Sequence, residues 1–350
     1  MEKSPLEIAC PVPISDYPNI LMAHGGGGRL MHQLLEKFFF AAFGNPILDL
    51  RHDAALLPLE EKNIAMTTDS YVVHPLFFPG GDIGSLAVYG TVNDLAMAGA
   101  RPRYLSAGFI LEEGLPVTTL WRVVLSMREA AQKSGVQIVT GDTKVVERGK
   151  GDGIFINTTG VGIIPEDRLV TPQRIQADDV LLINGDIGRH GMAIMAAREG
   201  LEFETNLESD STPLNPLVEA LFAEGVEVHC LRDLTRGGLA SVLVELSESS
   251  ESIFEINAEK IPVCEAVQGA CEILGLDPLY VANEGRMAIL IPASQEARAL
   301  EILSRYPEGR GSVRIGRVRE KGRPQVILKS QIGVPRVIDR LSGEQLPRIC

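Results

Sequence analysis

The chain has 350 residues, a length that favours two domains, and its 45% hydrophobic and 23% charged residues exclude a disordered or fibrous protein. Its net charge of −13 disfavours nucleic acid as a partner, because an acidic surface repels a phosphate backbone. A nucleotide can still bind where metal ions offset the carboxylates locally.

Nothing in the sequence is typical of export or of insertion into a membrane. Met1–Pro13 has one lysine and no apolar run long enough for a signal peptide. The most apolar stretch, Phe38–Phe43, is far shorter than the about 18 residues that a membrane span needs. The five cysteines contain no CxxC pair and do not indicate a disulfide framework. We therefore expect a cytoplasmic protein.

Strands and helices alternate through the first half of the chain, which predicts an α/β domain. Pro165–Pro172 has two prolines and no clear period, so we place a domain boundary there, after an N-terminal domain of residues 1–165. The predicted strands are Ile64–Thr68, Tyr104–Ile110, Val136–Thr140 and Ile154–Ile164, and the predicted helices are Ile83–Ala98 and Val117–Ser134.

A second domain, predicted over residues 173–331, mixes strands and helices in an α+β pattern. From Ile332 onward the sequence is aperiodic, and we interpret residues 332–350 as a mobile tail. The predicted strands are Val180–Asn184, Ser252–Asn257, Arg286–Pro292 and Gly311–Val318, and the predicted helices are Gly191–Arg198, Pro216–Ala223 and Gly238–Ser247.

A glycine-rich run, His24-Gly-Gly-Gly-Gly28, precedes the first helical pattern. It is not a standard nucleotide signature, because the chain has no GxxxxGK[ST] loop and Leu30 breaks the GxGxxG spacing. Such a loop, with Gly26 and Gly27 at its centre, can bring backbone N–H groups to phosphates at a helix N-terminus. A flexible lead-in to the domain is an equally good interpretation.

Aspartates recur where predicted strands end and on one predicted helix. Carboxylates at strand ends can converge on one crevice and hold Mg²⁺ together with substrate phosphates. Turn and cap chemistry explains a single aspartate after a strand, but it explains Asp94 less well, since that carboxylate lies on a helix face of small residues and needs a partner. Together they favour a Mg–triphosphate site; the residues are Asp53, Asp69, Asp94, Asp142 and Asp186.

Further polar motifs could act on such a ligand. In Gly141-Asp-Thr-Lys144, Lys144 could neutralise a phosphoryl group or simply pair with Asp142 at the surface. Arg232-Asp-Leu-Thr-Arg-Gly-Gly238 is typical of a helix N-terminus whose arginines could meet phosphates or solvent. Glu284 stands just before a predicted strand, where acid–base chemistry and an exposed turn are both possible. The six histidines form no cluster by spacing, which disfavours zinc.

Cys350 is the last residue of the sequence, at the end of the predicted tail. A thiol there would be exposed and mobile, although the neighbouring α-carboxylate disfavours the thiolate. Prenylation is excluded because its motif places the cysteine fourth from the end. A chance occurrence is one interpretation. The other is a swinging attachment point that delivers a bound group to a site elsewhere.

Several segments, in this order along nearly the whole chain, are shared with a known family: His24–Gly28, Thr68–Val73, Pro75–Gly81, Val92–Gly99, Gly141–Val146, Arg232–Gly238, Ala282–Gly285 and, most specifically, Pro347–Cys350. The chain resembles the HypE family of [NiFe]-hydrogenase maturation factors. This resemblance implies a two-domain, aminoimidazole ribonucleotide synthetase-like fold with an α/β N-terminal and an α+β C-terminal domain. It also implies a homodimer whose N-terminal sheets join in a barrel.

The activity implied by the resemblance is ATP-dependent dehydration of an S-carboxamide on Cys350 to a thiocyanate, which supplies cyanide for the hydrogenase iron. A carbamoyltransferase, HypF, would load the thiol, and a HypC–HypD complex would take the cyanide. The implied substrate and cofactor are ATP and Mg²⁺.

The resemblance also assigns roles to residues. Cys350 would carry the substrate, Lys144 would stabilise charge on the carboxamide oxygen or the γ-phosphate, and Glu284 would remove a proton. The chain departs from the family pattern at Ile187–His190, so neither Asp186 nor His190 is assigned to the site. Mg²⁺ would be held by Asp69, Asp94 and Asp142, and the nucleotide would be bound by Gly26, Gly27, Asp53, Asp69, Asn93, Asp94, Asp142, Asp233, Thr235 and Arg236.

Two alternatives stay open. Other ATP-dependent enzymes on the same scaffold, such as selenophosphate synthetase or thiamine-monophosphate kinase, would use the aspartates without needing Cys350. A non-enzymatic scaffold would dock a partner through its terminal carboxylate and consume no ATP. We rank the dehydratase ahead of both.

Overall fold

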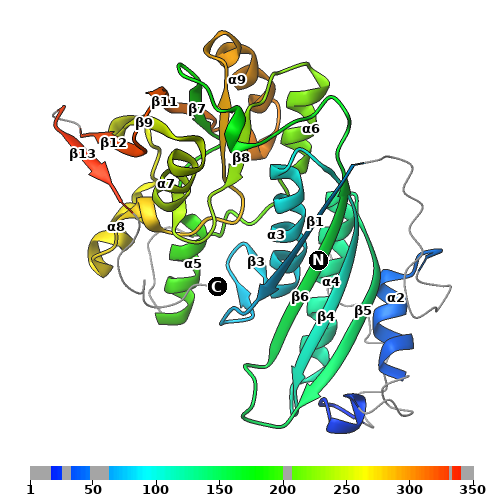
Figure 1. Cartoon of the computed structure of the whole chain (residues 1–350). Coiled ribbons are helices and arrows are strands. Elements are labelled where there is room, and N and C mark those ends of the chain that lie inside the picture. Colours follow the sequence, from blue (N-terminus) through cyan, green and yellow to red (C-terminus); the bar gives the residue numbers. More distant parts are fainter. Residues whose placement is uncertain (1–16, 26–32, 48–62, 200–206, 331–332, 340–350) are drawn as a thin grey trace, which may run out of the picture.

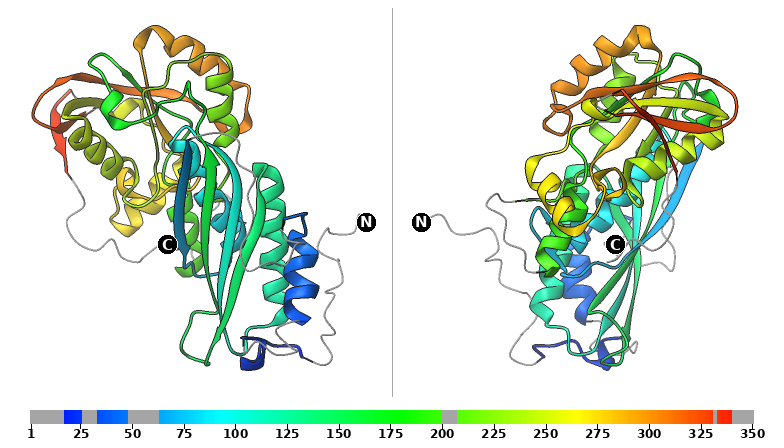
Figure 2. Two further views of the ribbon diagram at one scale, coloured as in Figure 1. Left: turned by 45° about the vertical axis from the view of Figure 1, so that its right-hand side comes forward. Right: turned by 90° about the vertical axis from the view of Figure 1, so that its left-hand side faces the viewer.

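The computed structural model describes residues 17–25, 33–47, 63–199, 207–330 and 333–339. Two domains, each built on one main sheet, are stacked on one another, with the C-terminal domain above the N-terminal domain in Figures 1 and 2. No helix among these residues is both long enough and apolar enough to cross a membrane.

The N-terminal domain is built on a four-stranded mixed sheet with the order β1-β6-β4-β5. Both β1 and β4 pair antiparallel with β6, whereas β4 and β5 run parallel. In β1 alternate residues face opposite sides of the sheet, as the strand period requires. The strands are β1 (Ile64–Tyr71), β4 (Arg101–Glu112), β5 (Gln137–Val146) and β6 (Ile154–Ile163).

Helices α3 (Ile83–Met97) and α4 (Val117–Ser134) cover one face of this sheet and lie behind it in Figure 1. A capping box between Asp82 and Ser85 starts α3, directly after the short β2–β3 hairpin (Phe77–Phe78 and Gly81–Asp82). A short helical segment, η2 (Leu35–Phe40) and α2 (Ala41–Phe43), packs beside β5 and α4.

The other face of the four-stranded sheet carries exposed apolar side chains. Met66 is 71% exposed and Ile110 is 43% exposed. Strand register places Asp142 beside Gly108 and Lys144 beside Ile110, so these two charged residues belong to the same open face. An open face of this kind is typical of an interaction surface.

The C-terminal domain is built on a seven-stranded mixed sheet with the order β13-β12-β9-β11-β7-β10-β8. Helix α7 covers one face, while α6 and α9 cover the other face at β7, β8 and β10. The strands are β7 (Val180–Ile183), β8 (Cys230–Asp233), β9 (Ser252–Asn257), β10 (Met287–Ile291), β11 (Val313–Lys321), β12 (Gln325–Lys329) and β13 (Pro335–Ile338). The helices are α5 (Arg189–Glu199), α6 (Asn215–Ala223), α7 (Gly238–Ser250), α8 (Glu265–Leu274) and α9 (Glu296–Ser304).

The two domains share one hydrophobic core where they meet. Ala96 and Met97, at the end of α3, are buried among side chains of α6, α9 and β10. A polar contact supports this packing: the Lys133 ammonium group donates to Thr212 Oγ1 at 3.2 Å. The C-terminal domain is therefore held firmly against the helix that carries Asp94.

Two predicted strands end too early, and each contains a site residue. β1 continues to Tyr71, so Asp69 lies within that strand and not after its end. β5 continues to Val146, so Asp142 lies within an edge strand and not after its end. Pairing with β4 along its length offsets the poor strand propensity of glycine and aspartate there. The helix predicted to begin at Gly238 is confirmed as α7, but the strand β8, which contains Arg232 and Asp233, was not predicted.

Other elements were missed by sequence reasoning. The helices α8 and α9 and the strand β12 stand where no element was predicted. The prediction that the chain has no regular structure from Ile332 on is wrong for Pro335–Ile338, which pair antiparallel with β12. That strand is fixed by its neighbours, because Arg336 pairs with Asp277 and Tyr280 donates to the carbonyl of Asp339.

Candidate active site

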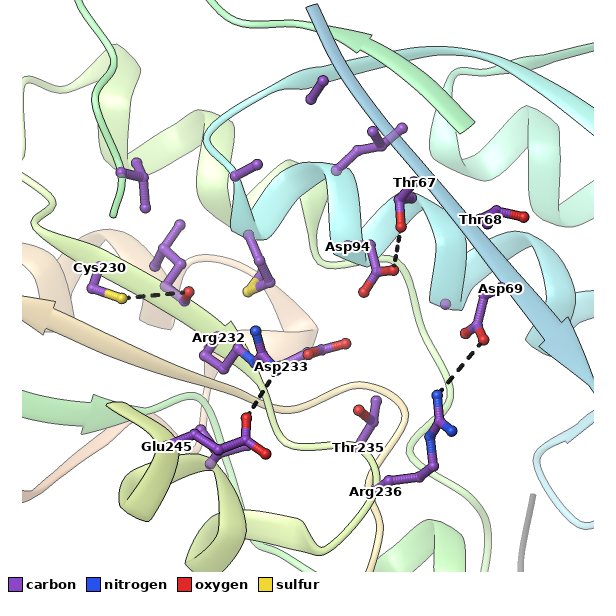
Figure 3. A pocket seen from close by; sticks show the side chains of 18 of the residues that line it. Thr67, Thr68, Asp69, Asp94, Cys230, Arg232, Asp233, Thr235, Arg236 and Glu245 are labelled. Carbon is purple, nitrogen blue, oxygen red and sulfur yellow. Dashed lines mark hydrogen bonds and ion pairs between the residues drawn. The ribbon is translucent and has the colours of Figure 1, made fainter. Parts of the chain in front are cut away.

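A cavity of about 700 Å³ lies between the two domains, beside the free edge of β1. β1 and α3 form one wall of the cavity. The end of β8, the loop that follows it and α7 form the other wall (Figure 3). The charged and hydroxyl side chains that line it include Thr67, Asp69, Asp94, Arg232, Asp233, Thr235, Arg236, Glu245 and Glu284.

Asp69 and Asp94 face the cavity from the N-terminal domain (Figure 3). Strand alternation puts Thr67 and Asp69 on the same side of β1, toward α3. The Thr67 hydroxyl donates to a carboxylate oxygen of Asp94 at 2.8 Å and so holds that side chain at the cavity wall. Burial, with a contribution from the charge of Asp69, raises the pKa of Asp94.

The opposite wall brings two arginines to these carboxylates. The Arg236 guanidinium lies 3.9 Å from a carboxylate oxygen of Asp69, across the domain boundary. Arg232 forms an ion pair with Glu245 of α7 at 3.0 Å. Arg232 lies near the end of β8, and Arg236 lies in the loop between β8 and α7. The cavity thus has cationic groups that can meet the oxygens of an anionic ligand.

Two further carboxyl groups of the cavity are buried. Asp233 and Glu284 are each 8% exposed. Burial and the charge of Asp94 raise the pKa of Asp233 to about 7, against the opposing effect of Arg232. Burial, with the charges of Asp233 and Asp210, raises the pKa of Glu284 well above its ordinary value. Like charges crowded in a dry site are stabilised when a cation binds beside them.

As the pH rises from 4 to 7, we expect the free energy of unfolding of the ligand-free protein to decrease because of Asp233. Its pKa of about 7 in the folded chain exceeds its ordinary value of 3.8, so the folded state keeps a proton that the unfolded state has released. The Asp233→Asn variant lacks this titration. Its Tm at pH 8 should exceed that of the wild type by about 2–4 °C, with a smaller difference at pH 4. Equal differences at both pH values, measured by thermal unfolding, would contradict the assignment.

The donor set of the cavity suits Mg²⁺. Asp69, Asp94, Asp233 and Glu284 offer the carboxylate oxygens that this ion prefers. Within the described ranges no three His, Cys, Asp or Glu side chains are close enough to form a complete metal cage. This arrangement fits an ion that is held by one or two carboxylates, waters and the phosphates of a substrate.

Asn93, predicted to bind the nucleotide, does not line the cavity. Its amide is buried behind the wall, where it donates to the carbonyl of Thr212 at 3.0 Å and accepts from the amide of Leu214 at 2.7 Å. Successive helix residues point about 100° apart, so Asn93 and its neighbour Asp94 face different ways. Asn93 ties α3 to the C-terminal domain.

Asp142 and Lys144 are also absent from this cavity. Both side chains are 65% exposed, and they lie 3.5 Å apart on β5. Three strand spacings, about 14 Å, separate β5 from β1 across the sheet. One chain therefore does not bring Asp142 to Asp69 and Asp94, with which it was predicted to hold Mg²⁺.

The remaining predicted residues lie elsewhere. Asp186 forms ion pairs with Arg189 and Arg286 outside the cavity. His190 is buried, and its Nδ1 is hydrogen-bonded to Ser209 Oγ at 2.8 Å. Neither lines the cavity, so Asp186 does not join the other aspartates there. The other predicted residues fall outside the described ranges: Gly26, Gly27, Asp53 and Cys350.

Sequence reasoning missed Thr67 and Glu245. Thr67 could have been found from strand alternation, since it stands two residues before Asp69. Glu245 has no comparable signal, because its place depends on how α7 packs against β8.

Both domains match known family models. Residues 51–164 match the N-terminal domain of the AIR synthase related proteins, and residues 176–329 match the C-terminal domain of the same group. The two matched segments correspond to the two sheets described above, with the connecting segment between them.

Individual relatives are similar over nearly their full length. Carbamoyl dehydratase HypE of Azotobacter vinelandii is 52% identical over 332 residues, which cover 95% of this chain and 97% of the relative. A crystal structure of the hydrogenase maturation protein HypE in complex with ATP is 48% identical, with a TM-score of 0.91 over 94% of this chain and 99% of that one.

A third comparison concerns an assembly. In a crystal structure of a HypE–HypF complex, the matching chain is 47% identical, with a TM-score of 0.77 over 90% of this chain and 100% of that one. The two-domain fold, the carboxylate-lined cavity between the domains and these similarities lead to one conclusion. The chain belongs to the HypE family of carbamoyl dehydratases, within the AIR synthase related proteins.

Proposed function

We propose that this protein uses ATP to dehydrate an S-carboxamide on Cys350 to a thiocyanate. The observation that carries the proposal is the cavity between the domains, in which Asp69, Asp94, Asp233 and Glu284 face Arg232 and Arg236. The relative crystallised with ATP supports the choice of nucleotide. The hydrogenase-maturation relatives support a cyanide ligand of the hydrogenase iron as the destination of the product.

The reaction divides into two steps because the oxygen of an amide is a poor leaving group. The carboxamide oxygen first attacks the γ-phosphorus of ATP and the nitrogen gives up one of its two protons, which releases ADP and leaves an imidate phosphate, Cys–S–C(=NH)–O–PO₃²⁻. The nitrogen then loses its remaining proton, the carbon–oxygen bond breaks, and the group departs as hydrogen phosphate. The products from one carboxamide and one ATP are a thiocyanate, ADP and phosphate, with release of a proton.

Residues of this chain support each step. Arg232 and Arg236 stabilise negative charge on the transferring phosphoryl group, because guanidinium groups match phosphate oxygens. Glu284 removes the proton from nitrogen: its raised pKa makes its carboxylate a stronger base than an ordinary glutamate. Glu284 and Asp233 are themselves buried, which shields the proton transfer at Glu284 from bulk solvent.

Asp69 and Asp94, on the wall formed by β1 and α3, would hold Mg²⁺, with Asp233 next to them. Bound there, the ion supplies positive charge that offsets the phosphates and lowers the repulsion among the carboxylates. The ion would also lower the pKa values of Asp94 and Asp233, which burial raises.

A homodimer, in which the open faces of two N-terminal sheets join in a barrel, completes this arrangement. The open face exposes Ile64, Met66 and Ile110, which a partner would cover. It also carries Asp142 and Lys144, which are too far from β1 to serve the cavity of their own chain. In the dimer each protomer lends these two residues to the site of its partner, where Asp142 joins the Mg²⁺ ligands and Lys144 neutralises the carboxamide oxygen or γ-phosphate.

Mixing two inactive variants tests the shared site. Asp69→Asn and Lys144→Ala should each abolish turnover alone. In a mixed dimer one site carries both changes and the other carries neither. Random exchange makes half of the dimers mixed, so activity should return to about a quarter of the wild-type value. The control is a mixture of Asp69→Asn with Asp94→Asn. Both changes remove a carboxylate from the same wall of the cavity, so each site of a mixed dimer keeps one defect and no activity should return. No recovery in the first mixture, with dimer exchange verified, would contradict site sharing.

The proposed partners follow from the same chemistry. A carbamoyltransferase, HypF, must load Cys350, and the solved HypE–HypF assembly of a relative supports this partner. A HypC–HypD complex then accepts the cyanide. The thiol of Cys350 belongs to a segment of the sequence that must reach first the loading enzyme, then the cavity and then the acceptor.

Phosphate release tests the proposed reaction. Protein that has been carbamoylated at Cys350 with cyanate should release a burst of phosphate from Mg-ATP that equals the loaded fraction. Unloaded protein should give no burst. Equal phosphate release by loaded and unloaded protein would favour the alternative, an ATP-dependent enzyme that acts on another substrate.

A further inference from the structure

We infer that Asp210 is a positioning residue that fixes the Glu284 side chain in the cavity through the backbone of the Glu284–Gly285 segment. Asp210 does not line the cavity and lies behind it, 7% exposed. Its carboxylate accepts backbone hydrogen bonds from His190 at 3.0 Å, Glu284 at 3.2 Å and Gly285 at 2.9 Å. The inference rests on the proposed role of Glu284 as the base.

Glu284 has no regular element to hold it, because it precedes β10 and follows the turn Pro278–Tyr280. Its peptide is held at both ends instead. The amide donates to Asp210, and the carbonyl accepts from the amide of Thr212 and from the side-chain amide of Asn93, each at 3.4 Å. The segment that contains Asp210 therefore determines the backbone position from which Glu284 enters the cavity.

The fit between the two segments is tight. A Cβ atom at Gly285 would stand 1.9 Å from the carbonyl oxygen of Asp210, so only glycine permits this approach. On its other side the Asp210 segment is fixed to the N-terminal domain, since Ser209 donates its amide to the carbonyl of Pro79 at 2.8 Å. Asp210 thus links Glu284 to the same domain that carries Asp69 and Asp94.

The carboxylate of Asp210 cannot be replaced by an amide without loss. One oxygen accepts from His190, and the other accepts from Glu284 and Gly285. An asparagine has a single acceptor oxygen, and its NH₂ group would face a backbone N–H. Asp210→Asn should therefore break the hydrogen bonds made by one of the two oxygens and let the Glu284 backbone shift.

The test is single-turnover phosphate release by carbamoylated protein. We compare the wild type, Asp210→Asn, Glu284→Gln and the double variant, and measure the binding of ATP to each. Asp210→Asn should slow the step about tenfold to a hundredfold, since small displacements of a reacting group cost rates of this order. The Kd for ATP should stay within about twofold, because the phosphate-binding side chains are untouched. In the Glu284→Gln background the same change should slow phosphate release by less than about a further twofold.

Asp179→Asn is the matched control. Asp179 is a buried carboxylate of the same domain that accepts from the amide of Gln176 at 2.8 Å and contacts His229 at 2.8 Å, and neither Asp179 nor His229 lines the cavity. It should lower Tm without slowing phosphate release. Asp210→Glu is measured as well. It keeps both carboxylate oxygens but places them one methylene further from the backbone, and it provides a second variant if Asp210→Asn does not fold.

The outcomes separate the two claims. A wild-type rate in folded Asp210→Asn, or an equal further loss in the Glu284→Gln background, would overturn the positioning role and leave the role of Glu284 standing. A wild-type rate in Glu284→Gln would overturn the role of Glu284 as base and the inference with it.

Discussion

Cys350→Ala should eliminate thiocyanate formation and the phosphate burst that accompanies loading, while ATP binding and Tm stay at wild-type values. The proposed reaction takes place on a group that is attached to this thiol, so no other side chain can substitute for it. The cavity residues that face the nucleotide are unchanged in this variant, and binding of ATP should therefore be retained. The measurement is the phosphate burst after treatment with cyanate.

The matched control is Cys264→Ala. Cys264 is partly accessible at the start of α8 and can also react with cyanate, but it lies away from the cavity. This variant should keep the full burst. If Cys350→Ala releases phosphate as the wild type does, the protein acts on a substrate other than its own thiol, as the related kinases would.

Asp94→Asn should lower turnover by about a hundredfold or more. The change removes a negative charge that faces the cavity at the point where Thr67 holds the side chain by a hydrogen bond. Without that charge the site loses a ligand for the cation that offsets the phosphates. Because burial raises the pKa of Asp94, the neutral asparagine should not destabilise the ligand-free protein.

Asp82→Asn, on the same helix, is the control for Asp94→Asn. Asp82 also has a pKa that burial raises, and it caps the N-terminus of α3 away from the cavity. Asparagine is an equally good N-cap, so fold and turnover should both be retained. A Mg-ATP titration of turnover distinguishes the two variants. Wild-type turnover in Asp94→Asn would show that the cation is held elsewhere.

The parts of the site that could be predicted from sequence are those with a local signal. Asp69 follows an apolar, β-branched run, and Asp94 interrupts a helix of small residues. The segment from Arg232 to Arg236 has an unusual density of charge. Apart from Leu234, all of these residues line the cavity. For Asp69, Asp94 and Asp233 the local pattern was sufficient because each side chain is oriented by its own strand or helix.

Predictions that depended on tertiary contacts failed. Asn93 was assigned to the nucleotide, together with Asp94, through the family resemblance, although helix geometry turns it toward the C-terminal domain. Asp142 was placed after a strand, because pairing with β4 cannot be seen in the sequence of β5. No local feature of the sequence marks Asp210. Its importance comes from backbone groups of residues 20 to 75 positions away in the chain.

The central claim is that the protein dehydrates a carboxamide on its own Cys350, and the mass of the peptide that contains Cys350 tests it most directly. The protein is carbamoylated with cyanate, the adduct is assigned to Cys350 by fragmentation, and the mass is measured before and after Mg-ATP is added. We predict loss of one water from the Cys350 adduct, only with Mg-ATP and not in Asp94→Asn. An adduct that keeps its mass in folded protein that hydrolyses ATP would contradict the claim.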